Sequence, residues 1–463
     1  MRALRIFVAI VALFYVVAHW GFQPWRRASS GVLNWDVYGY SFYLSGIIHG
    51  DVWQARHLDE IDTLYRPCND VLGYGRFPVV DSLTGERRGV VYKYTMGNAL
   101  FMSPFYFSAH AWALVSGRDA PNGYSRAYSQ AITIGWWFWS VWGLYLLGCL
   151  LLRYFRTEAV LLTLASIALA TNYYAYSVQQ IGMNHIPLFF CAALGALSAD
   201  NWARTGRGRD LYLLALMMGL SVLLRPTEAV LVLLLPAVLL LVQRHQGDVW
   251  AFVRARWGQL AIGAAVGLAT VFPQLLYWKL ATGHWLHYSY QGESFDFANP
   301  HIYKGLFSYR KGFFVYAPIM FLAVLGLPIL FWRWRGLALV LAAYLAANIY
   351  VIFSWQAWTY GGSFGARSMI QSMAFWALPM AAFWQAAATP VRRWAAYALA
   401  AMRYGVLIFF VWLNIVQTLQ YHWAVLHWEY MSRECYWYIF GKIHFTQDEL
   451  NHIYHLHHYP PDE

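Results

Sequence analysis

Residues 127–152 read AYSQAITIGWWFWSVWGLYLLGCLLL, a run of 26 residues without a charged side chain. A helix needs roughly 20 consecutive apolar residues to cross the hydrocarbon core of a membrane. This run is long enough, and so is FFVYAPIMFLAVLGLPILFW at 313–332, which also lacks charge. Both stretches therefore predict membrane-spanning helices.

The composition of the whole chain agrees with a membrane protein. Of its 463 residues, 60% are hydrophobic and only 12% are charged, whereas roughly 25% of the residues of a soluble domain are charged. The opening MRALRIFVAIVALFYVVAHWGF has a basic start and an apolar core, but no small-residue cleavage pattern follows it. We interpret it as a retained first span.

Arginine marks the connections that we expect to face the cytoplasm, since cytoplasmic loops carry the excess of basic residues. Arginines cluster beside apolar stretches at 2 and 5, 153 and 156, 204–209, 244–256, 333 and 335, and 392–403. These clusters contain no lysine, and all five lysines lie in other connections. The net charge of +11 comes largely from these arginines. Because they set the orientation of the spans, the positive charge is not evidence for nucleic acid as a partner.

The charge bias also limits the number of crossings. A complete crossing by the apolar segment 96–116 would invert every later span, so we expect this segment to form an interfacial helix in a long first outer loop, 23–126. We predict an all-α polytopic membrane protein with about eleven spans, its amino terminus inside and its tail outside. The spans lie near 6–22, 127–152, 158–178, 185–200, 211–224, 229–243, 257–278, 313–332, 336–353, 368–391 and 404–424.

The predicted organisation is one transmembrane domain, 1–424, followed by an outer tail, 425–463. The other outer loops of the domain are 279–312 and 354–367. All the candidate chemistry lies on this predicted outer side.

An isolated carboxylate stands in the first outer loop. Asp36 lies in NWDVYGYSFYLSG at 34–46, whose aromatic side chains suit a membrane interface. A carboxylate that is partly removed from water gains proton affinity, which suits a general base for a hydroxyl or an amine. The alternative is that Asp36 caps a helix beginning at residue 37, because aspartate is a favourable N-cap.

Two further positions bring charge close to the outer surface. Lys93, in VVYKYTMGNALF, suits a phosphate, and a lysine that snorkels to the interface is equally compatible with the pattern. Arg225 and Glu228 lie in LLRPTEA between apolar arms too short to cross the roughly 30 Å core. Charged side chains at that depth usually face a cavity, which predicts an arginine that faces a ligand. The alternative is that Arg225 and Glu228 pair with each other and only close the hairpin.

The later outer loops combine charged and aromatic side chains. The pattern of loop 279–312 is typical of carbohydrate binding, and its charged residues and histidine are Glu293, Asp296, His301, Lys304, Arg310 and Lys311. Arg310 stands directly before a span, so it suits either a phosphate or a structural role. In SWQAWTYGGSFGARSM at 354–369, glycine amides close to Arg367 predict an anion site, with a plain tight turn as the alternative.

Cysteine and histidine form no recognisable metal motif. The four cysteines lack metal-site spacing. The tail histidines lack regular ligand spacing, so we interpret the tail as solvated; they are His444, His452, His455, His457 and His458. Cys68 and Cys435 both lie on the predicted outer side, where a disulfide could join them.

In their order and on their common side, these motifs resemble the GT-C superfamily of polytopic glycosyltransferases, in particular bacterial members similar to the protein mannosyltransferases and the aminoarabinose lipid A transferases. The resemblance covers nearly the whole chain and rests on NWDVYGY, YKYTMGNALFMSPF, LLRPTEA, YSYQGESFDFANPHIYKGLFSYRKGFFVYAP and WTYGGSFGARS. It implies transfer of a sugar, with inversion, from a polyprenyl-phosphate carrier to a glycan, lipid or protein acceptor. It also implies the bacterial cytoplasmic (inner) membrane, with the active site facing the periplasm or the exterior.

The resemblance implies roles for individual residues. Asp36 would be the catalytic base, and the donor phosphate would be bound by Lys93, Arg225, Arg310 and Arg367. We expect the sugar or the acceptor to contact Tyr40, Glu228, Glu293, Asp296 and His301. The Asp-Glu pair of the protein mannosyltransferases is absent, since Val37 follows Asp36, and this weakens the case for a protein acceptor. One base and several cations suffice for the reaction, so no cofactor is required, and a divalent metal is left open.

Two other functions would also suit a polytopic chain. A transporter or lipid flippase places charges at membrane depth in short hairpins, and a non-catalytic assembly subunit would bind lipid or glycan without turnover. The sequence shows no inverted halves and no series of charges at the membrane midplane, and its largest loops lie on one predicted side. We therefore favour the transferase.

Overall fold

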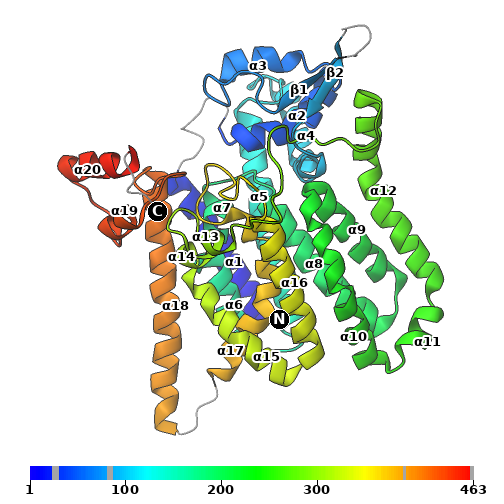
Figure 1. Ribbon diagram of the computed structural model, residues 1–463, viewed down its shortest axis with the longest axis vertical. Coiled ribbons are helices and arrows are strands. Elements are labelled where there is room, and N and C mark those ends of the chain that lie inside the picture. Colours follow the sequence, from blue (N-terminus) through cyan, green and yellow to red (C-terminus); the bar gives the residue numbers. More distant parts are fainter. Residues whose placement is uncertain (23–30, 81–86, 389–392, 459–463) are drawn as a thin grey trace.

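The computed structural model describes residues 1–22, 31–80, 87–388 and 393–458. Long apolar helices lie side by side along the longest axis of the molecule (Figure 1). Shorter helices and a small hairpin gather at one end, which we call the loop end: α2 (Trp35–His49), α3 (His57–Tyr65), β1 (Arg76–Val80) and β2 (Arg87–Tyr92). The protein is thus a polytopic all-α membrane protein, as predicted.

The bundle and its connections contain the remaining elements. The long apolar elements are α1 (Arg2–Phe22), α5 (Arg126–Leu151), α6 (Thr157–Ala170), α8 (His185–Thr205), α9 (Gly208–Leu224), η2 (Pro226–Leu234) continuing into α10 (Leu235–Gln246), α12 (Trp257–Thr282), α15 (Phe321–Arg333), α16 (Arg335–Phe353), α17 (Met373–Ala386) and α18 (Arg393–His422). The shorter elements are α4 (Gly97–Ser116), α7 (Tyr173–Val178), α11 (Val249–Arg254), α13 (Ile302–Phe307), α14 (Phe313–Tyr316), η3 (Pro318–Met320), η4 (Arg367–Met369), α19 (Arg433–Ile439) and α20 (Gln447–His458).

Every predicted span corresponds to a helix, but the helices differ in length. Within the described residues, seven are long and apolar enough to cross a membrane: α1, α5, α8, η2 with α10, α12, α16 and α18. The other four predicted spans correspond to the shorter helices α6, α9, α15 and α17. The eleven predicted spans therefore correspond to seven helices of full membrane-spanning length and four shorter helices.

Three predicted spans contain breaks that hydropathy does not reveal. The span 158–178 divides at Thr171, where extended backbone separates α6 from α7. The span 313–332 begins as α14 and η3 before α15 starts at Phe321. The span 368–391 begins within η4, and its helix α17 starts only at Met373 and ends at Ala386; residues 389–391 lie outside the described residues.

The predicted helix at 96–116 is present as α4. It begins at the outer end of α9, where the Thr95 hydroxyl donates to the Leu223 carbonyl at 2.6 Å. It then runs antiparallel to α5, since Phe101 packs on Trp139 and His110 lies 2.6 Å from the Tyr128 hydroxyl. The first turns of α4 lie beside the end of α9 and the middle of α5, and its later turns lie beside the start of α5. The helix therefore returns to the loop end without crossing the bundle.

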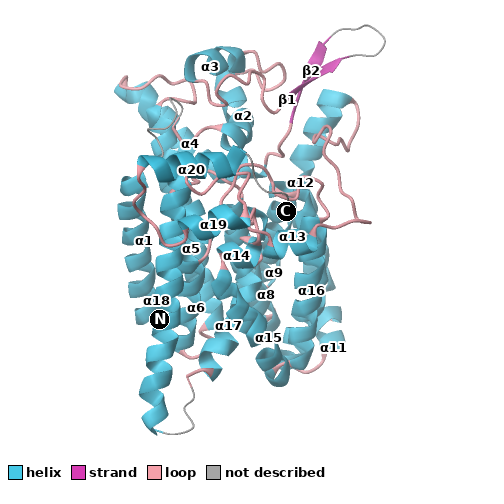
Figure 2. Ribbon diagram, turned by 60° about the vertical axis from the view of Figure 1, so that its left-hand side comes forward, coloured by secondary structure: helices cyan, strands magenta, loops and turns pink. Residues whose placement is uncertain are grey.

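The sequence analysis missed the hairpin β1–β2, which is the only sheet among the described residues (Figure 2). The strands pair antiparallel, with Phe77 opposite Val91. The hydroxyl of Tyr277, on α12, donates to the Val90 carbonyl at 2.7 Å, and the Lys93 amide donates to the Gly75 carbonyl at 2.9 Å. The hairpin thus fixes the position of the segment that carries Lys93.

The tail is not simply solvated, and that prediction was wrong. Ile453 and Leu456 of α20 are buried, as are Cys435 and Ile439 of α19. Both helices belong to the main hydrophobic core. The tail therefore packs against the loop end as an amphipathic cover.

The helices of the bundle approach closely where glycine faces backbone, as membrane helices commonly do. A Cβ at Gly326 of α15 would lie 1.8 Å from the carbonyl oxygen of Pro379 on α17. The two backbones are therefore in direct contact at this crossing.

Gly326→Ala is expected to destabilise the protein by about 1–3 kcal/mol, because the added methyl must push α15 and α17 apart. Thermal unfolding of the detergent-solubilised protein measures this as a lower midpoint. Gly405→Ala on α18 is the matched control, since its Cβ would meet nothing within 4 Å. Equal midpoints for the two variants would contradict the close crossing.

Candidate active site

Asp36 lies in the first turn of α2, and its carboxylate binds three side chains from distant segments. Oδ1 accepts hydrogen bonds from the hydroxyls of Tyr74 at 2.7 Å and Tyr94 at 2.6 Å. Oδ2 accepts one from Nη2 of Arg367 at 2.9 Å. The N-cap position of α2 is Asn34, so the helix-cap alternative for Asp36 is wrong.

A glycine-rich loop positions Arg367. Gly365 has a φ of 59°, in the left-handed region that favours glycine, and a Cβ there would lie 2.8 Å from Cβ of Tyr316. Nη2 of Arg367 also donates to the Tyr360 carbonyl. In the structure, the anion beside this loop is the Asp36 carboxylate itself. Phosphate binding by Arg367 stays a prediction.

The ionisation of Asp36 is set by two opposing effects. Burial raises its pKa, but the Arg367 guanidinium and then the hydroxyls of Tyr94 and Tyr74 outweigh burial and hold the pKa below its ordinary value. The raised proton affinity expected from the sequence is therefore wrong in direction. Asp36 is ionised at neutral pH, and its side chain is 17% exposed, so a substrate atom can reach it.

Arg225 and Glu228 form the mutual pair that was the alternative interpretation. Nε and Nη2 of Arg225 donate to Oε1 of Glu228 at 3.1 and 2.5 Å, and Nε2 of Gln371 donates to the same oxygen at 2.9 Å. Glu228 is buried. However, Nη1 of Arg225 is buried without a hydrogen-bond partner among the residues that the structure describes. Arg225 therefore keeps one donor for a ligand.

Lys93 forms an ion pair across two loops. Its Nζ donates to Oε1 of Glu293 at 2.7 Å and lies 5.3 Å from the centre of the Tyr290 ring. Its charge also acts on Asp36 and lowers the pKa of that carboxyl. Lys93 is thus held beside the Asp36 site rather than extended towards the membrane interface.

Tyrosine side chains fill the space between these charged groups. The Tyr94 ring lies 4.6 Å from that of Tyr40 and 6.1 Å from that of Tyr290. Burial raises the pKa of the Tyr290 hydroxyl, as do the charges of Asp36 and Glu293, so this hydroxyl stays protonated. The charges of Arg225 and Arg367 also reach Tyr290. This residue therefore lies between the Asp36 and Arg225 pairs.

Three predicted site residues lie elsewhere. Arg310 donates to the carbonyl and to Oε1 of Glu429, both at 2.8 Å, and is thereby tied to the tail. Asp296 accepts from the backbone amides of Ala298 and Asn299 at 3.1 Å and so caps its own exposed turn. The His301 ring lies 6.1 Å from that of Trp358, close to Arg310 rather than to Asp36.

The structure adds residues that the sequence analysis did not single out. Tyr74 and Tyr94 bind the carboxylate directly. His185, at the start of α8, is 4% exposed, yet neither of its ring nitrogens has a hydrogen-bond partner within the described part of the chain. Both Arg367 and Arg225 act on it electrostatically. His185 therefore borders the space between the two arginines.

The described residues contain neither a metal-binding cluster nor a disulfide. Among the described residues, no group of three or more His, Cys, Asp or Glu side chains is placed to hold a metal ion. Cys68 and Cys435 are both buried free thiols, and Cys435 Sγ lies 3.5 Å from Nε2 of His457. The structure thus contains no bond between these cysteines.

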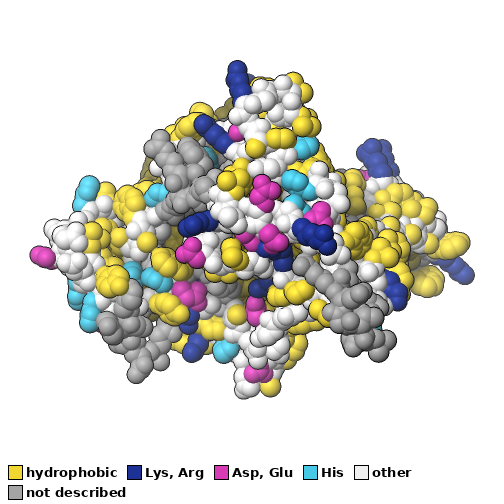
Figure 3. All heavy atoms as spheres, turned by 90° about the horizontal axis from the view of Figure 1, so that it is seen from above, with side chains coloured by type: hydrophobic (Ala, Val, Ile, Leu, Met, Phe, Trp, Pro, Cys, Tyr) yellow, Lys and Arg dark blue, Asp and Glu magenta, His cyan; other side chains and the backbone are white. Residues whose placement is uncertain are grey.

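Seen from above, the loop end presents acidic and basic side chains close together near its centre, with hydrophobic side chains toward the periphery (Figure 3). This distribution matches a charged site surrounded by membrane-facing surface. The Asp36, Lys93, Arg225 and Arg367 side chains all belong to this end of the molecule.

Comparison with known proteins gives a structural likeness only. No family model and no curated protein sequence matches the chain. The apo crystal structure of the Archaeoglobus fulgidus oligosaccharyltransferase matches with a TM-score of 0.51 at 13% identity, over 99% of this chain and 60% of that one. The oligosaccharyltransferase AglB from the same organism, in complex with an inhibitory peptide and a dolichol-phosphate, gives a TM-score of 0.48 at 11% identity, over 98% and 60%. The chain thus spans about 60% of the length of these proteins, and it has the GT-C fold that the sequence predicted.

Proposed function

We propose that this protein is a membrane glycosyltransferase that moves a sugar from a polyprenyl-phosphate carrier to an acceptor at the loop end, with inversion and with Asp36 as the base. The observation that carries the proposal is the convergence on one space of an ionised carboxylate and several cations. Asp36 and Arg367 are in direct contact, and Lys93 and Arg225 lie close by. The GT-C fold is compatible with this chemistry.

The carboxylate retains capacity for a substrate proton. An ionised carboxylate offers about four lone-pair sites, and Tyr74, Tyr94 and Arg367 use three of them. An acceptor hydroxyl can therefore donate to Oδ2 of Asp36. As the acceptor oxygen forms its bond to the anomeric carbon, its proton passes to Asp36, and the phosphate leaves with the electrons of the broken bond.

The departing phosphate needs positive charge, which Arg225, Lys93 and Arg367 would supply. The free Nη1 of Arg225 is a preorganised donor in a buried position, and such donors stabilise developing negative charge most effectively where water is excluded. Lys93 and Arg367 already pair with Glu293 and Asp36. The phosphate would therefore compete with these carboxylates for two of its three cations.

Of the residues assigned to the sugar or the acceptor, Tyr40, Glu228 and Glu293 lie nearest to Asp36 and its cations. Asp296 and His301 lie farther along the loop 279–312 and would meet a larger acceptor. Arg310 would act on the donor only through a rearrangement that releases Glu429. The acceptor class stays open between glycan, lipid and protein.

The proposed setting is the bacterial cytoplasmic membrane, with the loop end facing the periplasm. The arginines at the opposite end of the bundle support this orientation, because basic residues favour the cytoplasmic side. The membrane lipid and the lipid-linked donor are the proposed partners.

Asp36→Asn is expected to reduce sugar transfer by about 10²–10⁴-fold, because the amide cannot take the acceptor proton. Donor binding should persist, since the cations remain. Release of polyprenyl phosphate from a panel of lipid-linked sugars measures turnover, and native mass spectrometry measures binding. Asp70→Asn, at a carboxylate that is 94% exposed, is the control. If the protein were a transporter or an assembly subunit, Asp36→Asn would not abolish turnover while leaving donor binding intact.

The pH dependence of kcat/KM tests the ionisation of Asp36. The pKa of Asp36 lies below the ordinary value of 3.8. Protonation of Asp36 should therefore not reduce wild-type activity between pH 8 and pH 5. Tyr94→Phe removes a hydrogen bond to the charged form of Asp36, so the pKa of Asp36 should rise and the acid limb of kcat/KM should move to higher pH. Tyr303→Phe, at an exposed ring, should leave the limb in place. An acid limb unmoved by Tyr94→Phe would contradict the assignment.

A further inference from the structure

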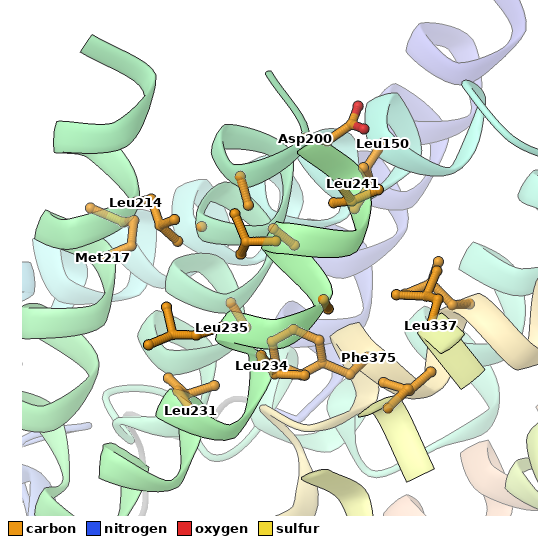
Figure 4. A pocket seen from close by; sticks show the side chains of 18 of the residues that line it. Leu150, Asp200, Leu214, Met217, Leu231, Leu234, Leu235, Leu241, Leu337 and Phe375 are labelled. Atoms are coloured by element: carbon orange, nitrogen blue, oxygen red, sulfur yellow. The ribbon is translucent and has the colours of Figure 1, made fainter. Parts of the chain in front are cut away.

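An apolar cavity with a wide opening lies inside the helix bundle, away from Asp36. Its enclosed volume is about 130 Å³, and the space reaches about 1030 Å³ when the open region at its mouth is included. It is enclosed by α8, α9, η2, α10, α16 and α17, and Figure 4 shows Leu214, Met217, Leu231, Leu234, Leu337 and Phe375 along its walls. The walls are almost entirely hydrocarbon.

The charged side chains of the cavity lie at one end. Asp200, Tyr154, Arg244 and Trp334 line that end, which belongs to the arginine end of the bundle, defined here as the C-terminal ends of α5, α8, α10 and α15. Side chains from these four helices contact one another there: Arg153 with Asp200, and Arg244 and Arg333 with Trp334. This end lies opposite the loop end (Figure 1).

The carboxylate at this end is already satisfied. Asp200 is fully buried and accepts hydrogen bonds from Nη1 of Arg153 at 2.5 Å, from Nε of Arg204 at 2.8 Å and from the Tyr154 hydroxyl. Its negative charge is therefore shared by two guanidinium groups before any ligand arrives.

Two further arginines at this end lack such a partner: Arg244 lines the cavity, and Arg333 lies against Trp334, which lines it. Arg244 is exposed, lies 5.0 Å from the Trp334 ring and 5.6 Å from the Tyr154 ring, and pairs with no carboxylate in the described part of the chain. Arg333 lies 4.5 Å from the Trp334 ring and donates to the Tyr154 carbonyl at 3.2 Å. Stacking on aromatic faces leaves the edge of the Arg244 guanidinium free, and Arg333 keeps the donors that do not bind the Tyr154 carbonyl. Guanidinium edges match the geometry of a phosphate.

We propose that this cavity and its arginine rim bind an anionic phospholipid from the leaflet at the arginine end. The headgroup phosphate contacts Arg244 and Arg333, and one acyl chain enters the cavity between α9 and α10. Basic pockets between transmembrane helices bind anionic lipid headgroups in this way. An apolar chain suits the walls, since they offer it no unsatisfied polar group.

The position of the charge distinguishes this lipid from the proposed sugar donor. A polyprenyl-phosphate donor would bring its phosphate to Arg225 and Lys93 at the loop end. The free cations of the cavity lie at the other end, so the ligand must enter with its headgroup in the opposite leaflet. This site is independent of the proposed transferase activity.

The test uses the full-length protein in nanodiscs of mixed phosphatidylglycerol and phosphatidylcholine. Either lipid carries a diazirine at the end of one acyl chain, and mass spectrometry locates the labelled residues after illumination. We expect phosphatidylglycerol to label the cavity walls, including Met217 and Leu231, far more than phosphatidylcholine does. Both lipids carry a phosphate, but only phosphatidylglycerol has a net negative headgroup, so labelling by phosphatidylcholine at the same level would overturn the selection of an anionic lipid.

Two variants test the rim and the cavity separately. Arg244→Gln should reduce the phosphatidylglycerol retained in native mass spectra roughly tenfold, because a charge-assisted contact is lost. Arg335→Gln is the matched control, since this exposed arginine lies at the same end over Phe331 but does not line the cavity. Ala196→Phe should fill the cavity and abolish wall labelling while the rim stays intact.

The proposal fails if Arg244→Gln and Arg335→Gln retain equal amounts of phosphatidylglycerol. It also fails if a diazirine-tagged polyprenyl phosphate, added alone, labels the cavity walls as strongly as phosphatidylglycerol does. In that case the cavity belongs to the donor chain. Circular dichroism of each variant confirms that it is folded, so that lost labelling reports on binding.

Discussion

The ion pair between Asp36 and Arg367 joins residues that are 331 positions apart in the sequence. A largely buried charge is tolerated only when partners satisfy it, and Tyr74, Tyr94 and the Tyr360 carbonyl complete the set. The pair thus fixes the first outer loop on the loop before α17. Without it, the acid and the cations of the proposed reaction would have no common location.

The molecule carries different charge chemistry at its two ends. At the loop end, acids and bases are paired, and the pairs leave one carboxylate lone pair and one guanidinium donor for substrate. At the arginine end, the guanidinium groups exceed their carboxylate partner. The 3-10 helix η2 connects the two regions, because Glu228 at its start pairs with Arg225 and Leu231 and Leu234 line the cavity. A lipid chain in the cavity would therefore pack on the element that supports Arg225.

The bundle was predictable because lipid imposes strict rules on sequence: each span must satisfy its own backbone, and basic residues sort by side. Breaks such as that at Thr171 were not predictable, because they depend on packing rather than on hydropathy. Asp36, Lys93 and Arg367 stood out because charge is rare near these spans. Tyr74 and Tyr94 did not stand out among 34 tyrosines, and the pairing of Arg310 with Glu429 joins a loop to the tail, which no local pattern indicates.

An experimental structure of the protein with bound polyprenyl phosphate tests the central claim most directly. The account predicts that the phosphate contacts Arg225 and at least one of Lys93 and Arg367, with Asp36 facing the position that the anomeric carbon would occupy. A phosphate bound at the arginine end, or an Asp36 carboxylate turned away from the bound lipid, would contradict the account.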